Sequence, residues 1–168
     1  WKGQEFSKYV KEGPSYAATY VSWDDAVAFC KKLSEREGKT YRLPTEVEWE
    51  YACRGGTETR WSFGDDEKAL VDYAWYEKNA FSNLEKFAHL VKLRKPNAFG
   101  IHDMHGNVWE WCNDYYDVDY YKESPAKDPP GPMRGDFRVI RGGSWGRSAG
   151  LTRSANRSIG AANDRSDY

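Results

Sequence analysis

The first periodic pattern in the chain predicts a helix that runs from Ser22 to Gly38. Ser22 is followed three residues later by Asp25, which is the spacing of a capping box at a helix start. Gly38 follows a charged last turn, as glycine commonly does at a helix C-terminus. The apolar residues between these limits recur at helical spacing: Ala26, Val27, Phe29, Cys30 and Leu33.

A second pattern predicts a helix that begins at Thr45 and ends at Gly55. Glu48 stands three residues after Thr45, which again matches a capping box. Two consecutive glycines, at 55 and 56, stop the helix. We expect its inner face to hold Val47, Tyr51 and Ala52.

After residue 56 the helical period disappears. Residues 57–100 mix short apolar groups with Gly, Asn, Asp and Pro, and residues 73–76 could form at most a short strand. Residues 113–136 have the composition of a loop, whereas 137–141 predict a strand that ends at two glycines. We find no repeat and no linker. We therefore expect residues 1–168 to form one loop-rich α+β domain that is incomplete at both ends.

Composition narrows the class of protein. The chain is 16% aromatic with a mean hydropathy of −0.90, so it is neither disordered nor built around membrane spans. Its net charge of −1 gives no general basic surface for nucleic acid. Three distant cysteines fit buried free thiols better than a disulfide scaffold or a four-ligand zinc site.

The start of the sequence bears on the cellular compartment. It begins at Trp1 and shows no signal peptide, which suggests a trimmed N-terminus. We expect a bacterial or phage protein of the cytoplasm or the cell surface.

Four segments carry a family resemblance, in their order and spacing. They are residues 21–26 (VSWDDA), 41–52 (YRLPTEVEWEYA), 97–111 (NAFGIHDMHGNVWEW) and 138–145 (RVIRGGSW). Together they resemble the sulfatase-modifying-factor family, to which the formylglycine-generating enzyme belongs. The resemblance implies a variant of the C-type lectin fold, with two helices, small antiparallel sheets and much irregular loop. Because several functions share that fold, function must be argued from the site.

The resemblance also identifies which chemistry is missing. Oxidases of the family use two cysteines soon after the Gly-Gly-Ser-aromatic motif to hold copper, because thiolates are soft ligands for Cu(I). Residues 145–153 contain no cysteine, so we expect no copper and no formylglycine-generating activity. His102 and His105 form a His-x-x-His pair without a third ligand at a suggestive spacing. We expect these histidines to bond to backbone groups or water.

Residues 103–110 predict a structural calcium site. Asp103 and Glu110 offer carboxylates, Asn107 an amide, and Gly106 can turn the chain so that carbonyls point inward. The resemblance implies a ligand set of two side chains, Asp103 and Glu110, with the backbone oxygens of Gly106 and Val108. The alternative is a carboxylate and amide network that holds the loop without metal.

The C-terminal stretch, residues 146–168, is rich in Arg, Ser, Asn and Gly and contains no Lys. The resemblance places it on the concave face where the family's enzymes bind substrate. Its pattern of fixed positions is also similar to that of the C-terminal variable region in retroelement-diversified proteins. The alternative is an ordinary polar loop. The candidate ligand-binding residues are Trp145, Gly146, Arg147, Ser148, Gly150, Leu151, Ser158, Ile159, Gly160, Ala161, Asp164, Ser166, Asp167 and Tyr168.

Three functions remain open at this point. The first is a non-catalytic domain that binds a protein or a small molecule through this C-terminal surface. The second is the substrate-binding part of an oxidoreductase, such as a sulfoxide synthase, whose metal site lies elsewhere. The third is a paralogue that regulates a true oxidase.

Overall fold

The two predicted helices are present and begin and end where the sequence indicates. The computed structural model describes residues 10–11 and 13–166. Helix α1 spans Trp23–Glu37 and helix α2 spans Glu46–Arg54. Each has a complete capping box, from Ser22 and from Thr45, and each ends at a glycine in the left-handed conformation. The local capping signals were therefore sufficient to place both helices.

The predicted inner face of α2 was wrong at Tyr51, whereas Ala52 packs against the core as expected. The helix buries Glu46, Trp49 and Cys53, whereas Tyr51 keeps 68% of its surface exposed. The inner face can include Glu46 because arginines from elsewhere in the chain neutralise its charge. A prediction from hydrophobic periodicity misses this residue, because it assigns glutamate to the solvent-facing side. Helix α1 has no buried residue, and Phe29 on it is exposed.

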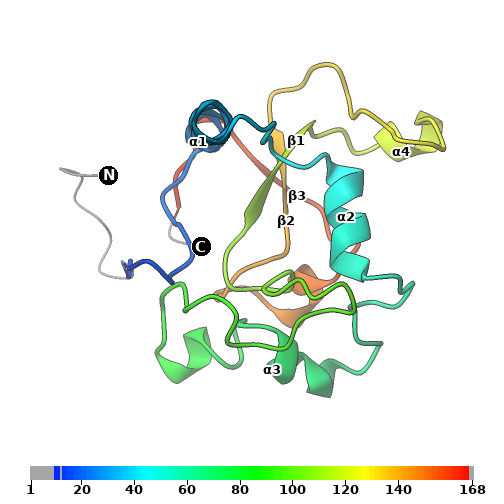
Figure 1. Cartoon of the computed structure of the whole chain (residues 1–168). Coiled ribbons are helices and arrows are strands. Elements are labelled where there is room, and N and C mark those ends of the chain that lie inside the picture. Colours follow the sequence, from blue (N-terminus) through cyan, green and yellow to red (C-terminus); the bar gives the residue numbers. More distant parts are fainter. Residues whose placement is uncertain (1–9, 12, 167–168) are drawn as a thin grey trace.

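A small antiparallel sheet forms the centre of the molecule (Figure 1). Its strands are β1 (Glu110–Tyr115), β2 (Arg138–Arg141) and β3 (Ser158–Gly160), in the order β1-β2-β3. Strand β2 confirms the predicted strand at 137–141, while β1 and β3 carried no clear strand pattern. One face of the sheet, with the buried Cys112 and Val139, packs against Trp49 and Cys53 of α2.

The remainder of the chain is irregular, as the α+β prediction requires. The short helical turns are η1 (Glu67–Ala69), α3 (Leu70–Tyr73), η2 (Phe81–Asn83), α4 (Tyr120–Glu123) and η3 (Ala149–Thr152). The possible strand at 73–76 was wrong, because Tyr73 ends α3 and only Trp75 makes a bridge, to Gly106. In the part of the chain that the structure describes, no helix is long and apolar enough to cross a membrane.

Two segments that are far apart in sequence run side by side next to the sheet. The backbone N–H of Tyr20 donates to the carbonyl of Ser166 at 2.7 Å, and that of Trp23 donates to the carbonyl of Ala162 at 3.0 Å. The indole N–H of Trp111 on β1 donates to the carbonyl of Val21 at 2.9 Å. The chain entering α1 and the C-terminal segment thus form a wall that faces the second side of the sheet (Figure 1).

Candidate functional site

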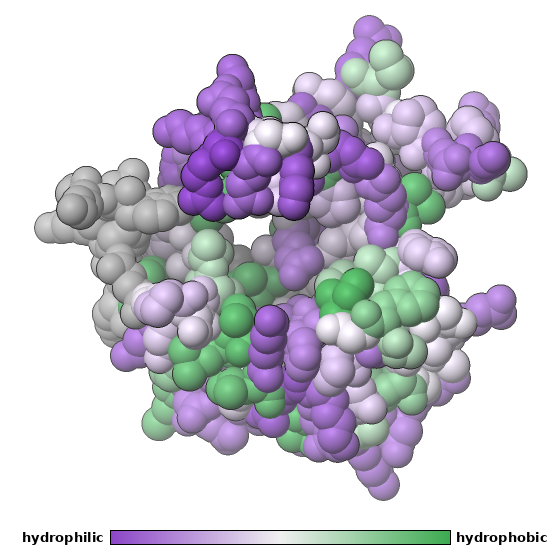
Figure 2. Space-filling model, viewed as in Figure 1, coloured by the Kyte–Doolittle hydropathy of each residue, from purple (hydrophilic) through white to green (hydrophobic). Residues whose placement is uncertain are grey.

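A cavity of about 790 Å³ lies between this wall and the sheet. Figure 2 shows the molecule hollowed beside α1. The apolar side of the cavity includes Trp109, Trp111 and Ile140, and residues 18–21 close it from the opposite side. Trp111 pairs with Ile140 and Ile140 pairs with Ser158, so one row across all three strands lines the cavity. A volume of this size is within the range of ligand pockets.

The structure brings seven of the candidate ligand-binding residues to this cavity. They are Arg147, Leu151, Ser158, Ile159, Gly160, Asp164 and Ser166. Gly146, Ser148, Gly150 and Ala161 belong to the same two segments but do not line it. Asp167 and Tyr168 lie outside the described residues.

Two of the candidates are buried for structural reasons. Trp145 is only 4% exposed and packs with Ala80 and Ala88 in the core, so its ring is not offered to solvent. Gly160 lies under the ring of Trp111, where an added Cβ would be 2.5 Å from an indole carbon. Because Gly160 has no side chain, the Trp111 ring can pack directly on the backbone of β3.

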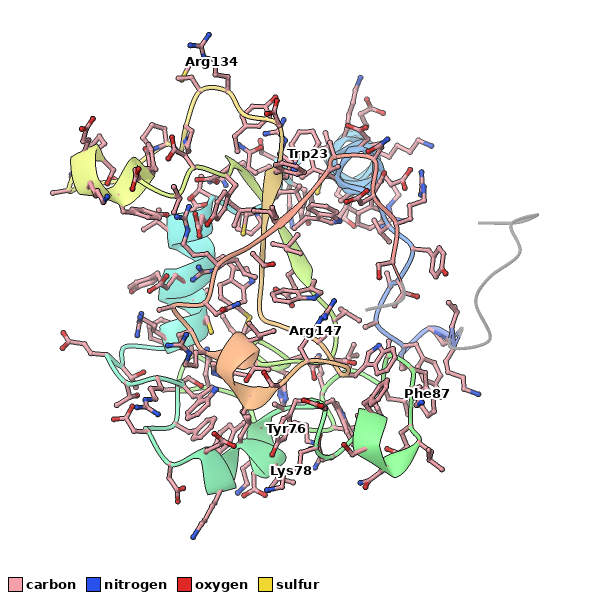
Figure 3. The ribbon with its side chains drawn as sticks, turned by 180° about the vertical axis from the view of Figure 1, so that it is seen from behind. Trp23, Tyr76, Lys78, Phe87, Arg134 and Arg147 are labelled. Carbon is pink, nitrogen blue, oxygen red and sulfur yellow. The ribbon has the colours of Figure 1, made fainter. Side chains whose placement is uncertain are left out.

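Charged groups of both signs line the cavity. Arg147 extends from the loop after Trp145 toward the open centre, on the side away from Trp23 (Figure 3). Arg165 pairs with Asp25 of α1, and this hydrogen bond lowers the pKa of the Asp25 carboxyl. Asp164 accepts a hydrogen bond from the backbone N–H of Ala161 at 2.8 Å. The cavity thus joins an apolar floor to a rim of arginine and carboxylate groups, which suits a ligand with both polar and apolar parts.

Part of this cavity was not anticipated from the sequence. From the sequence, Trp109 and Trp111 belong only to a family motif and Ile140 to a predicted strand, and residues 18–20 belong to no predicted element. No local signal marks them, because their common position depends on strand register and on the pairing of two distant segments.

Both carboxylates of the predicted calcium loop are partly withdrawn from water, and burial raises the pKa of each. Burial, together with a smaller effect of the negative charge of Asp103, raises the pKa of Glu110 to about 7. Burial also raises the pKa of Asp103, which accepts a hydrogen bond from the backbone N–H of Lys92 at 2.8 Å. Glu110 accepts a hydrogen bond from the indole N–H of Trp49 at 2.6 Å. Two desolvated carboxylates that repel one another are a donor set that a hard cation would stabilise.

The rest of the loop is held by the protein itself. The side-chain oxygen of Asn107 accepts a hydrogen bond from the backbone N–H of His89 at 2.8 Å, so the amide serves the loop structure. Gly106 has φ +81° and packs so closely on Trp75 that an added Cβ would lie 2.0 Å from its carbonyl oxygen. Among the described residues there is no group of three or more His, Cys, Asp or Glu side chains that could hold a metal. A calcium site here must therefore draw on backbone oxygens and water in addition to the two carboxylates.

The histidine expectation is confirmed, and the described cysteines are free. The imidazole Nδ1 of His102 lies 2.7 Å from the carbonyl of Arg94, and that of His105 lies 2.8 Å from the carbonyl of Thr152. Burial lowers the pKa of His105 to about 4.

Cys30, Cys53 and Cys112 are free thiols, and burial raises the pKa of Cys53 to about 12. A buried neutral thiol is a poor nucleophile and a poor metal ligand.

Comparison with known proteins assigns the family. Residues 2–168 match the sulfatase-modifying factor enzyme 1-like domain, and the chain belongs to this family. It is 40% identical to the formylglycine-generating enzyme of Streptomyces coelicolor over 140 residues, which are 79% of this chain and 43% of that enzyme.

Two solved structures have a similar fold. Treponema denticola variable protein 1 has a TM-score of 0.83 and 31% identity, over 99% of this chain and 73% of that one. PvdO from Pseudomonas aeruginosa has a TM-score of 0.83 and 32% identity, over 94% and 60% of the two chains. The chain spans about half or less of the length of the formylglycine-generating enzymes that it matches.

Proposed function

We propose that this chain is a non-catalytic binding domain of the sulfatase-modifying-factor family. Its ligand is a protein segment or a small molecule that enters the cavity between the sheet and the C-terminal segment. The observation that carries the proposal is the convergence of seven C-terminal residues on one cavity with an apolar floor and a charged rim. The similarity to a variable protein also supports a binding role, because diversity is useful at a recognition surface.

The oxidase reaction is not part of the proposed function. The stretch after Trp145 that the resemblance equates with the copper ligands holds arginine, serine and threonine instead of cysteine. The described thiols of Cys53 and Cys112 are completely buried on the α2 side of the sheet. These residues do not fit a Cu(I) site at the C-terminal stretch.

A larger, charged side chain in the cavity lining is expected to weaken binding. We would pan a library of displayed random 12-residue peptides against the domain and measure the affinity of the selected peptides. Leu151→Arg places a large charged side chain at the cavity lining and should weaken binding at least about tenfold, the equivalent of about 1.4 kcal/mol. Val118→Arg, at an exposed site outside the cavity, is the matched control and should bind like the parent. Equal affinity of both variants would contradict the proposal, as would a library that yields no binder.

A structural calcium ion at residues 103–110 forms the second part of the proposal. Asp103 and Glu110 would hold it with their side chains, and Gly106 and Val108 with backbone oxygens. Bound calcium would neutralise the repulsion between two partly buried carboxylates. Its role would be to stabilise the loop that leads into β1.

Calcium is therefore expected to raise the melting temperature. At a concentration one hundred times the dissociation constant, a site present only in the folded state adds about 2.7 kcal/mol, or about 5–10 °C for a chain of this size. Asp103→Asn and Glu110→Gln should each remove most of this shift in a thermal melt. Asp119→Asn, at the start of α4, is the control and should keep it. A shift that survives both loop substitutions would place the ion elsewhere.

A further inference from the structure

A strip of the surface away from the cavity combines positive charge with exposed apolar side chains. Residues 86–102 contain four Lys or Arg and no Asp or Glu, in a chain whose net charge is −1. Within this stretch Val91, Leu93, Phe99 and Ile101 are exposed, Leu93 by 58%. Phe99 also packs on the exposed Tyr51 of α2, with ring centroids 5.5 Å apart. We call residues 91–101 the basic-apolar strip.

The backbone of this strip is fixed in place. Lys92 has φ +65°, which is uncommon for a residue with a side chain, and the carboxylate of Asp103 accepts its N–H. The N–H of Val91 donates to the carbonyl of Ser15 at 2.8 Å, and that of Lys95 donates to the carbonyl of Asp72 at 2.9 Å. Three backbone N–H groups, one of them from the strained Lys92, thus hold this exposed segment, and strained backbone is found at recognition sites. The apolar side chains of the strip are thus presented on a pre-organised backbone, which lowers the entropic cost of binding.

A contact between its two ends folds the strip back on itself. The imidazole of His102 lies 2.7 Å from the carbonyl of Arg94, so residues 91–95 run beside residues 101–103. Figure 2 shows apolar side chains beside hydrophilic ones across this part of the molecule, below the hollow. Large apolar side chains that gather at the surface mark interaction sites more often than isolated ones do.

The charge of the strip suits a partner with a few carboxylates rather than a membrane. Lys95 is already paired with Asp72, Nζ to Oδ2 at 2.8 Å, and the guanidinium of Arg94 stacks on Trp75 at 3.5 Å. Lys92 and Lys95 are both exposed, and the Lys95 side chain keeps 61% of its surface accessible within its ion pair, so a partner's carboxylates can reach both ammonium groups. So few cations attract an anionic bilayer too weakly for stable attachment.

We propose that the basic-apolar strip binds an acidic peptide segment that also carries apolar side chains. Carboxylates of the segment would pair with Lys92 and its neighbours, and its apolar side chains would cover Leu93 and Phe99. This surface is separate from the cavity, so the proposal does not depend on the ligand proposed there.

The test uses a fluorescein-labelled 12-residue peptide in which Glu or Asp alternates with Leu or Ile, and measures its anisotropy with the full chain. Leu93→Asp should weaken binding at least about tenfold, because it removes an apolar contact and adds a like charge. Val118→Asp makes the same change at a site that is 71% exposed and outside the strip, and should bind like the parent. Leu151→Arg should also leave this binding unchanged, which separates the strip from the cavity. Affinity should fall as salt rises.

Three results would overturn the proposal. The first is equal binding by the parent and Leu93→Asp. The second is equal binding of a peptide in which every acid is replaced by Gln. The third is Leu93-dependent binding to vesicles that contain phosphatidylserine without binding to the peptide, which would assign the strip to a membrane. Thermal melts of each variant check that it is folded, and these exposed substitutions should change the melting temperature little.

Discussion

Glu46→Gln is expected to destabilise the fold by about 3–5 kcal/mol, because it removes the buried carboxylate that Arg141 and Arg157 share and leaves Arg141 paired with Glu50 alone. Glu46 is 2% exposed and Arg141 is 0% exposed. One Glu46 oxygen accepts hydrogen bonds from Arg141 at 3.0 Å and from Arg157 at 2.7 Å, and the other accepts from Arg157 at 2.9 Å. The amide cannot neutralise two guanidinium groups, and Arg141 has no access to water.

Chemical denaturation measures this loss, and a melting temperature about 10 °C lower should accompany it. Glu48→Gln on the same helix is the matched control. Glu48 forms an exposed ion pair with Arg42, and glutamine can still complete the capping box, so the cost should be about 1 kcal/mol or less. Similar losses for the two variants would mean that Arg141 and Arg157 find other anions, and that this network does not hold α2 to the sheet.

Gly106→Ala is expected to have a comparable effect through backbone packing. The added Cβ would lie 2.0 Å from the carbonyl oxygen of Trp75, and that oxygen already accepts the N–H of Asn107 at 2.8 Å. Relief of the clash requires the bridge between Trp75 and Gly106 to open. We expect a loss of about 3–5 kcal/mol, together with loss of the calcium-dependent shift proposed above.

Gly38→Ala separates the two causes of that loss, which are the positive φ and the clash of the added Cβ. Gly38 has φ +64°, similar to the +81° of Gly106, but an added Cβ there would meet nothing within 4 Å. Its substitution should therefore cost only the conformational preference, about 1–2 kcal/mol. If denaturation gives the same loss at both positions, then close packing against Trp75 is not what requires glycine in this loop.

The helices were predictable from sequence because their signals are local. Ser22 with Asp25, and Thr45 with Glu48, form capping boxes within four residues, and both are present in the structure. The inner face of α2 was not predictable, because Glu46 is buried only through arginines that lie about one hundred residues later in the chain. Strand β3 has three residues and no alternating pattern, so only its pairing with β2 defines it.

The candidate site, too, could be predicted from the sequence only in part. The C-terminal residues were predicted from composition and family resemblance, and seven of them do line one cavity. Residues 18–21 line the cavity too, because Tyr20 pairs with Ser166 in the same wall and Trp111 bonds to Val21. Those contacts join residues that are 90 or more positions apart, which no local pattern records.

Hydrogen–deuterium exchange with a selected 12-residue peptide bound tests the central claim most directly. If the chain is a binding domain whose ligand occupies the cavity, the peptide should slow exchange in residues 18–21, 146–151 and 158–166. Residues 91–101 and the exposed face of α1 should exchange as they do in the free protein. Protection confined to those regions, with the cavity segments unchanged, would contradict the account.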